Sequence, residues 1–332
     1  MNVIDLHCHT IASDGLLSPA EVVAYAAKLG METIAITDHD TVDGIAEALA
    51  AAAHWDIEVI PGVEINTDVP EGEVHILGFF FNDGWQDVEL GALLRRIEAG
   101  RIVRARKMVQ KLVTLGAPIS FQRVQEIARG DIIGRMHVAL ALVEAGHVAT
   151  RREAFARYID RHGPAYADRF KLSPADACRA IARAAGLPVL AHPLVGMTGG
   201  VAAIANLEVR LTALGDAGLV GLEVYYPSHT AVMMDQLLAL ARRFDLIPSG
   251  GSDYHGPMAE KVDLGSVYVP RRCLRRLREA AHAYPISSSP KKPNHSSTSC
   301  DDSGGSSRSR CEEGRGARSR AANSAEGTTP AP

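Results

Sequence analysis

Short apolar runs that end in histidine or acidic residues recur along this chain and constrain its fold more than any other feature. Each run is too short for a helix, and helical patterns separate most of them. The runs begin near residues 3, 33, 58, 74, 188, 220 and 246. Helices are expected over 18–30, 44–54, 173–186, 203–217, 230–244 and 271–283. Strands that alternate with helices predict a parallel α/β sheet or barrel.

The alternation stops between residues 86 and 171, where helical periodicity takes its place. Residues 95–135 hold ten Lys or Arg against three acidic residues, although the whole chain has a net charge of −4. We therefore expect an α/β domain made of residues 1–85 and 172–285, with a basic helical insertion, 86–171, that covers its site as a cap. A basic insertion on an acidic protein predicts an anionic ligand beneath it.

Apolar runs and cysteine content indicate the cellular location of the protein. No apolar run reaches the roughly 18 residues that a membrane span needs, and no basic leader precedes the first strand. Five cysteines without a Cys-x-x-Cys pair argue against a disulfide framework and a thiolate zinc site. We expect a cytoplasmic protein without a membrane partner. Residues 286–332 have almost no apolar side chains, so we predict a disordered tail there.

The ends of the expected strands carry potential metal ligands. His7 and His9 alternate with Cys8, so both imidazoles lie on one face of the first strand and Cys8 packs behind it. In parallel α/β folds these ends meet at one edge, where sites are built. So many ligands predict two or three divalent metals, with Glu64 as a bridging carboxylate. The ligand positions are His7, His9, Asp14, His39, Glu64, His75, His192, Asp253 and His255.

With these residues the chain resembles the polymerase and histidinol phosphatase (PHP) family. The resemblance covers residues 1–285 and fills all nine ligand positions of the family. It implies a distorted (β/α)7 barrel. It also implies three metal positions: His7, His9, Glu64 and Asp253; Glu64, His75 and His192; and Asp14, His39 and His255. Nitrogen and oxygen ligands with many carboxylates favour Mn²⁺, with Fe²⁺ and Zn²⁺ as alternatives.

Within that family the chain is most similar to enzymes that act on nucleoside 3′,5′-bisphosphates and short 5′-phosphorylated RNA. The sequence from Ile133 to His137, inside the insertion, carries this similarity. The planar guanidinium of Arg135 suits a phosphate. The resemblance implies small nucleotides and short RNA as partners and gives no reason to expect DNA. Residues expected to touch substrate are Arg135, His137, Ser228 and His229.

The expected chemistry is hydrolysis at phosphorus. Clustered cations lower the pKa of a bound water to about 7. We expect the resulting hydroxide, positioned by Glu64, His192 and Asp253, to attack phosphorus in line. No covalent enzyme intermediate is needed. Asp38 and Asp40 are expected to orient the imidazoles.

Two other functions stay open at this point. Histidinol phosphatase would use the same metal chemistry on a substrate that bears a cationic amine, which the basic insertion disfavours. A non-catalytic, metal-stabilised scaffold would be expected to have lost ligands, and this chain has kept all nine. The sequence does not indicate an oligomeric state.

Overall fold

A single mixed sheet of seven strands forms the centre of the protein. The computed structural model describes residues 3–69, 72–129, 132–195, 201–257 and 262–283. The strands stand in the sheet in chain order. They are β1 (Ile4–Cys8), β2 (Thr33–Ile36), β3 (Glu58–Val69), β4 (Gly72–Phe79), β5 (Leu187–Leu190), β6 (Gly221–Tyr225) and β7 (Ile247–Gly250).

Only β4 runs against the direction of the other strands. It pairs antiparallel with both β3 and β5, whereas the remaining pairs are parallel. β4 runs antiparallel to β3 because the connection between Val69 and Gly72 is short. A parallel neighbour would need a crossover of a dozen residues or more. The sequence predicted the strand but not its direction.

Contacts between β1 and the chain after β7 nearly close the sheet. The amide of His9 donates to the Tyr254 carbonyl at 2.8 Å. Gly251 permits this approach, because a Cβ atom there would lie 2.4 Å from the amide nitrogen of His7. The structure therefore confirms the predicted distorted (β/α)7 barrel, with the reversed β4 as part of the distortion.

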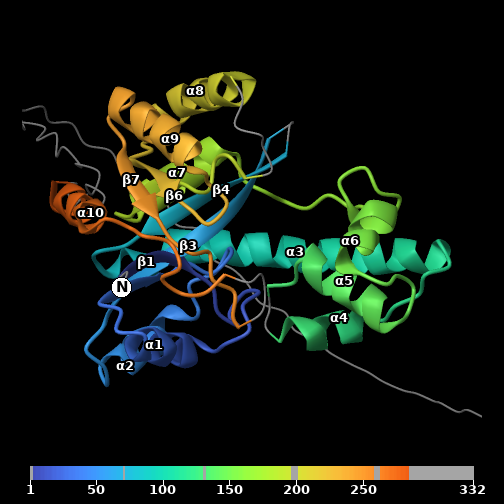
Figure 1. The fold of residues 1–332 in the computed structure, drawn as a ribbon. Coiled ribbons are helices and arrows are strands. Elements are labelled where there is room, and N and C mark those ends of the chain that lie inside the picture. Colours follow the sequence, from blue (N-terminus) through green and yellow to red (C-terminus); the bar gives the residue numbers. More distant parts are fainter. Residues whose placement is uncertain (1–2, 70–71, 130–131, 196–200, 258–261, 284–332) are drawn as a thin grey trace, which may run out of the picture. The chain divides into compact units, whose positions relative to one another are not determined.

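Helices pack around this barrel where the sequence predicted them (Figure 1). Ser18 and Glu21 form the expected reciprocal capping box, and Gly30 follows the helix with φ +73°. The buried Cys8 packs on these helices, behind the strand. The barrel helices are α1 (Pro19–Lys28), α2 (Ile45–Ala52), α7 (Pro174–Arg183), α8 (Val201–Gly215), α9 (Ala231–Arg243) and α10 (Arg271–Ala283).

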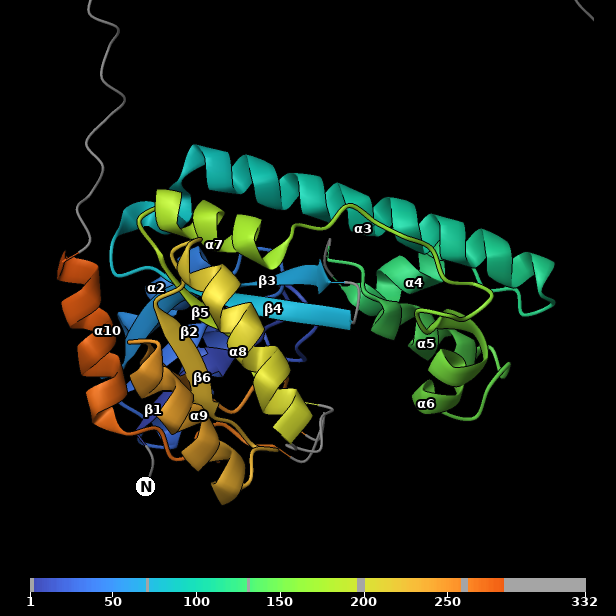
Figure 2. The ribbon, with the colours of Figure 1, turned by 90° about the horizontal axis from the view of Figure 1, so that it is seen from above.

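The helical insertion begins with a long helix that runs from the barrel to a small helical group (Figures 1 and 2). This group has an apolar core of its own, which includes Met108, Val124 and Leu142. Its elements are α3 (Val88–Thr114), α4 (Phe121–Ala128), α5 (Arg135–Glu144), α6 (Arg151–Ala154) and the π-helical turn η2 (Phe155–Ile159); a 3-10 turn, η1 (Asp83–Gln86), precedes α3.

The division into a domain of residues 1–85 and 172–285 with an insertion at 86–171 stays a prediction. The predicted tail, 286–332, lies outside the described residues. Among the described residues, no helix combines the length and the apolar character needed to cross a bilayer.

Candidate metal centre

All nine expected ligand residues meet at one end of the barrel. His7 lies in β1, and His9 and Asp14 follow that strand. Glu64 lies within β3, which is longer than the sequence indicated, and His75 lies in the first half of β4, which starts at this end of the barrel because β4 is antiparallel to β3. The others stand just beyond strand ends: His39 after β2, His192 after β5, and Asp253 and His255 after β7.

Glu64 stands at the centre of this rim and is fully buried. Its two oxygens face different sets of imidazoles. Oε1 lies 2.8 Å from His75 Nδ1 and 2.9 Å from His192 Nε2, and Oε2 lies 2.9 Å from His39 Nδ1 and 3.3 Å from Nε2 of His7 and of His9. One carboxylate thus lies between five imidazoles.

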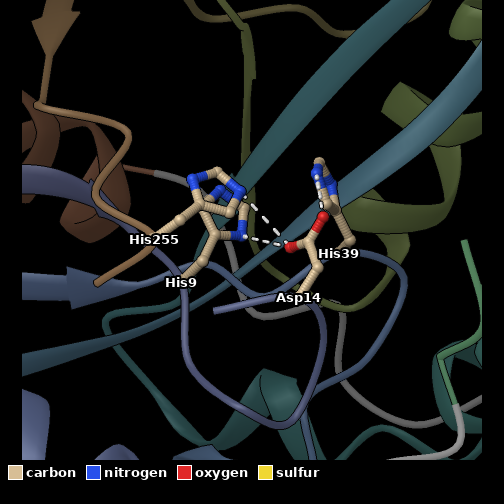
Figure 3. Close-up of side chains that lie close together, drawn as sticks. All are labelled: His9, Asp14, His39 and His255. Carbon is tan, nitrogen blue, oxygen red and sulfur yellow. Dashed lines mark ion pairs between the residues drawn. The ribbon is translucent and has the colours of Figure 1, made fainter. Parts of the chain in front are cut away.

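A second carboxylate, Asp14, faces three imidazoles on the outer side of the rim (Figure 3). Its Oδ1 lies 3.3 Å from His255 Nε2 and 3.9 Å from His9 Nδ1, and its Oδ2 lies 3.8 Å from His39 Nε2. The rings of His9 and His255 stack with centroids 4.2 Å apart. The ligand atoms of these four residues therefore lie within 4.8 Å of one another.

The donor atoms fit divalent metals. Buried polar atoms normally have hydrogen-bond partners, yet six in this rim have none among the described residues. These atoms are His7 Nε2, His9 Nδ1, His9 Nε2, His39 Nδ1, Glu64 Oε2 and Asp253 Oδ1. Three groups have ligand atoms within 4.8 Å of one another: His7, His9, Glu64 and Asp253; His9, Asp14, His39 and His255; and His39, Glu64 and His75.

The protonation of the rim reflects its crowded charges. Burial alone would lower the pKa of His39, but Glu64 and Asp14 raise that pKa to about 9. Burial alone would also lower the pKa of His255, but the carboxylates of Asp14 and Asp253 raise that pKa to about 10. Burial would raise the pKa of Glu64, but His39 and other imidazoles hold it well below its usual value. Metal binding to these imidazoles would displace their protons.

Glu223, in β6, has a role that the sequence analysis missed. The buried His7 Nδ1 donates to Glu223 Oε1 at 3.0 Å, and the His192 amide donates to Oε2 at 2.6 Å. This bond leaves His7 Nε2 free to face Glu64 and Asp253. A single acidic residue inside an otherwise apolar strand was the only signal in the sequence.

Tyr226 was also not predicted to act on a ligand. Its hydroxyl donates to Asp253 Oδ2 at 2.8 Å, which leaves Oδ1 pointing toward the imidazoles. Burial and the neighbouring Asp253 raise the pKa of Tyr226 far above its usual value, so the hydroxyl keeps its proton. Tyr226 therefore orients the Asp253 carboxylate.

Asp38 and Asp40 do not orient imidazoles, which corrects the expectation for both. Asp38 accepts from Thr10 and Ser13, and so holds the loop that follows His9. Asp40 accepts from Asn66, Arg101 and Arg169. Among the described residues, neither carboxylate makes a hydrogen bond or ion pair with an imidazole of the rim.

Two rim residues and the neighbouring Asp40 have left-handed backbone angles, which are unfavourable for side chains with a Cβ atom. The φ angles are +56° at Asp40, +23° at His192 and +56° at Asp253. Each such conformation costs about 1–3 kcal/mol. The surrounding hydrogen bonds, such as that from the His192 amide to Glu223, hold the chain in these conformations.

A cavity of about 630 Å³ opens from the rim toward the insertion. Asp14 and His255 line it on the barrel side, and His137 lines it on the insertion side. His137 is buried, and its Nδ1 accepts from the Gly134 amide at 3.0 Å. The cavity thus lies between the rim and residues of α4 and α5.

The other residues expected to touch substrate have different surroundings. Arg135 pairs with Glu73 of β4 at 3.0 Å. Ser228 is exposed. His229 is buried, and its Nδ1 donates to the Val224 carbonyl at 2.9 Å. The structure therefore brings His137 to the cavity beside the rim, which Arg135, Ser228 and His229 do not line. The His229 ring lies 5.3 Å from the ring of Tyr226, which binds Asp253.

Comparison with known proteins agrees with this geometry. The PHP domain family model matches residues 5–88. A 5′-3′ exoribonuclease of Haemophilus influenzae is 35% identical, covering 80% of this chain and 96% of its own length. A 3′,5′-nucleoside bisphosphate phosphatase of Chromobacterium violaceum is 36% identical, and the match covers 79% of this chain and 90% of that protein.

A solved structure from Bifidobacterium adolescentis, described as a candidate metal-dependent phosphoesterase, has the same fold. It superimposes with a TM-score of 0.71 at 30% identity, covering 82% of this chain and 94% of its own. The similarity to these proteins covers about four-fifths of this chain and most of their own lengths. The chain belongs to the PHP domain family.

Proposed function

We propose that this chain is a metal-dependent phosphoesterase that removes the 3′-phosphate of nucleoside 3′,5′-bisphosphates and also shortens 5′-phosphorylated RNA from its 5′ end. The observation that carries the proposal is the rim around Glu64, where six buried nitrogen and oxygen atoms have no hydrogen-bond partner within the described residues, beside a cavity that Asp14 and His255 of the rim line. Relatives with these two activities in their names align over about four-fifths of the chain. Both activities are hydrolysis of a phosphate ester at O3′.

The nine rim residues would hold the metals. His7, His9, Glu64 and Asp253 form one position, as the resemblance implied, and their ligand atoms lie within 4.8 Å of one another. His75 and His192 would bind a second ion with Glu64, and Asp14, His39 and His255 a third. Manganese suits these nitrogen and oxygen donors. When bound, such cations activate water and neutralise charge on phosphoryl oxygens.

The protein's own side chains would position the reacting groups. Glu223 and Tyr226 fix His7 and Asp253, so that the ligand atoms are preorganised. Glu64, His192 and Asp253 would hold the attacking water against phosphorus. Water oxygen joins phosphorus and the bond from phosphorus to O3′ breaks, which releases phosphate and a 3′-hydroxyl. His137 would contact the substrate from the insertion side.

The charges of the cavity favour this substrate over histidinol phosphate. Two glutamates line the cavity, Glu126 and Glu144, and both pair with Arg123. Arg129 and Arg151 line it as well. The arginines would attract an anionic substrate. A cationic amine would gain less from the two glutamates, because both already form ion pairs with Arg123.

Phosphate release from adenosine 3′,5′-bisphosphate, histidinol phosphate and a 5′-phosphorylated RNA oligomer tests the proposal. With manganese present, we expect the bisphosphate to turn over fastest and the RNA to lose nucleotides from its 5′ end. A chelator and the His192→Ala variant should each abolish turnover. Faster turnover of histidinol phosphate would overturn the substrate assignment, and no turnover of any substrate would support a scaffold instead.

A further inference from the structure

Five basic side chains gather where the insertion meets the barrel, and we call them the cationic cluster. Most have a carboxylate partner. Arg101 and Arg169 share Asp40, and Arg135 and Lys171 share Glu73. The cluster consists of Arg101 and Arg104 of α3, Arg135 of α5, and Arg169 and Lys171 of the segment that returns to the barrel. Cations outnumber these carboxylates, so the cluster has excess positive charge.

Arg104 is the member of this cluster without a partner. It is only 4% exposed, and within the described residues its side chain makes neither a hydrogen bond nor an ion pair, although the charge of Glu73 acts on it from a distance. Burial, followed by the neighbouring Arg101 and Arg169, lowers its pKa to about 9, so it remains charged at neutral pH. A buried charge without a partner is costly, which indicates that an anion completes this site.

Two further observations indicate a ligand at the same place. The side chain of Arg169 is 2% exposed, and its Nε is buried without a hydrogen-bond partner. The first turn of α5 begins beside Arg101, since a Cβ atom on Gly134 would lie 3.8 Å from Arg101 Nη1. The amide groups at a helix start favour an anion, as do paired guanidinium groups, and phosphate satisfies both.

The cationic cluster adjoins the metal centre along two elements. Asp40, which binds two of its arginines, directly follows His39. Glu73, which binds Arg135, precedes His75 by two residues on β4 and so lies on the same face of the strand. A nucleotide whose 3′-phosphate reaches the rim could therefore extend its second phosphate toward the cluster.

We propose that Arg104 and Arg169 bind the phosphate that is not cleaved, the 5′-phosphate of the substrate, and thereby select substrates that carry it. This inference rests on the proposed 3′-phosphatase activity for its biological meaning, although binding at the cluster can be measured without turnover. Arg104 and Arg169 are then specificity-determining residues distinct from the metal ligands.

The first test compares adenosine 3′,5′-bisphosphate with adenosine 3′-monophosphate, which lacks the 5′-phosphate. In the Arg104→Met variant, the ratio of the two kcat/KM values should fall by roughly 30-fold or more, mainly through KM for the bisphosphate. Arg106→Met is the matched control, because Arg106 is an exposed arginine on the same helix. An unchanged ratio in Arg104→Met would overturn the proposal.

The second test needs no turnover. Calorimetry should show that metal-free protein binds adenosine 5′-monophosphate and that Arg104→Met binds it at least about 30-fold more weakly. The variant should unfold at the same temperature as the parent or higher, because a buried repulsion has been removed. A less stable variant would show that Arg104 is structural, and unchanged binding would also overturn the proposal. If the parent binds this nucleotide through Arg104 but hydrolyses no 3′-phosphate, only the proposed function fails.

Discussion

Glu223 shows how single buried side chains determine the chemistry of this rim. It is fully buried and binds the ring of one expected metal ligand and the backbone of another. His192 has a strained φ of +23°, and the Glu223 bond to its amide helps to hold that conformation. Glu223 thus positions ligands without occupying a ligand position.

The Glu223→Gln variant should bind manganese about 10–100-fold more weakly than the parent, because an amide offers one acceptor oxygen where the carboxylate offers two. His7 or His192 would then lose its partner. Equilibrium dialysis with manganese measures the effect. Glu208→Gln is the control, since Glu208 forms an exposed ion pair with Arg243. Equal affinities of the parent and Glu223→Gln would contradict the role assigned to Glu223.

At the residue scale, the sequence predicted the rim but not the residues that support it. Histidines and acidic residues near successive strand ends have one common explanation, because parallel strands bring those ends together. The partners of Glu223 and Tyr226 come from other elements of the barrel, and strand pattern carries no information about them. Asp38 and Asp40 were misassigned for the same reason, since closeness to His39 in sequence does not fix where a carboxylate points.

At the element scale, α3 joins the insertion to the barrel. Arg101 on this helix donates to Asp40 through Nε at 2.8 Å, and Arg169 donates to the same oxygen at 3.3 Å. All three side chains are almost fully buried. Their bonds link the loop after β2 to both ends of the insertion.

The Asp40→Asn variant should lose about 3–5 kcal/mol of unfolding free energy, because it leaves two buried guanidinium groups without a countercharge. Urea unfolding followed by circular dichroism measures the loss. The exposed pair of Glu208 and Arg243 offers a comparison, since Glu208→Gln should change stability by less than about 1 kcal/mol. A similar small change for Asp40→Asn would show that this link does not stabilise the fold.

The elements themselves were largely predictable, with one informative exception. Capping residues such as Ser18 and apolar periodicity located the helices well. The strands β3 and β4 extend further than their apolar runs and pair as a hairpin, which places Glu64 within a strand instead of at its end. Polar residues in the outer part of the hairpin hid its length, because hydrophobic periodicity detects only the buried part of a strand.

At the scale of the whole molecule, the barrel supplies the rim and the insertion supplies part of the cavity. The His7 side chain is fully buried, as is that of Glu64, so the inner part of the rim brings unlike charges together away from water, whereas Asp14 and His255 face the cavity. Such a site is formed only when the barrel closes, because its residues come from six of the seven strands or the segments that follow them. Metal binding and folding are therefore coupled.

Manganese should stabilise the metal-free protein. An ion at 100 times its dissociation constant adds about 2.7 kcal/mol to the free energy of unfolding. Differential scanning calorimetry with and without manganese should show this as an increase in Tm that a chelator reverses. The increase should be much smaller in His192→Ala. A Tm that manganese leaves unchanged in the parent would contradict the coupling of metal binding to folding.

The most direct test of the metal centre is the number of manganese ions bound per chain, measured by elemental analysis after equilibrium dialysis. We predict two or three ions for the parent. We predict at least one ion fewer for Glu64→Gln, because that carboxylate contributes to two of the three proposed positions and lies between five imidazoles of the rim. No bound manganese in the parent, or equal binding in Glu64→Gln, would contradict the assignment of this rim as a metal centre.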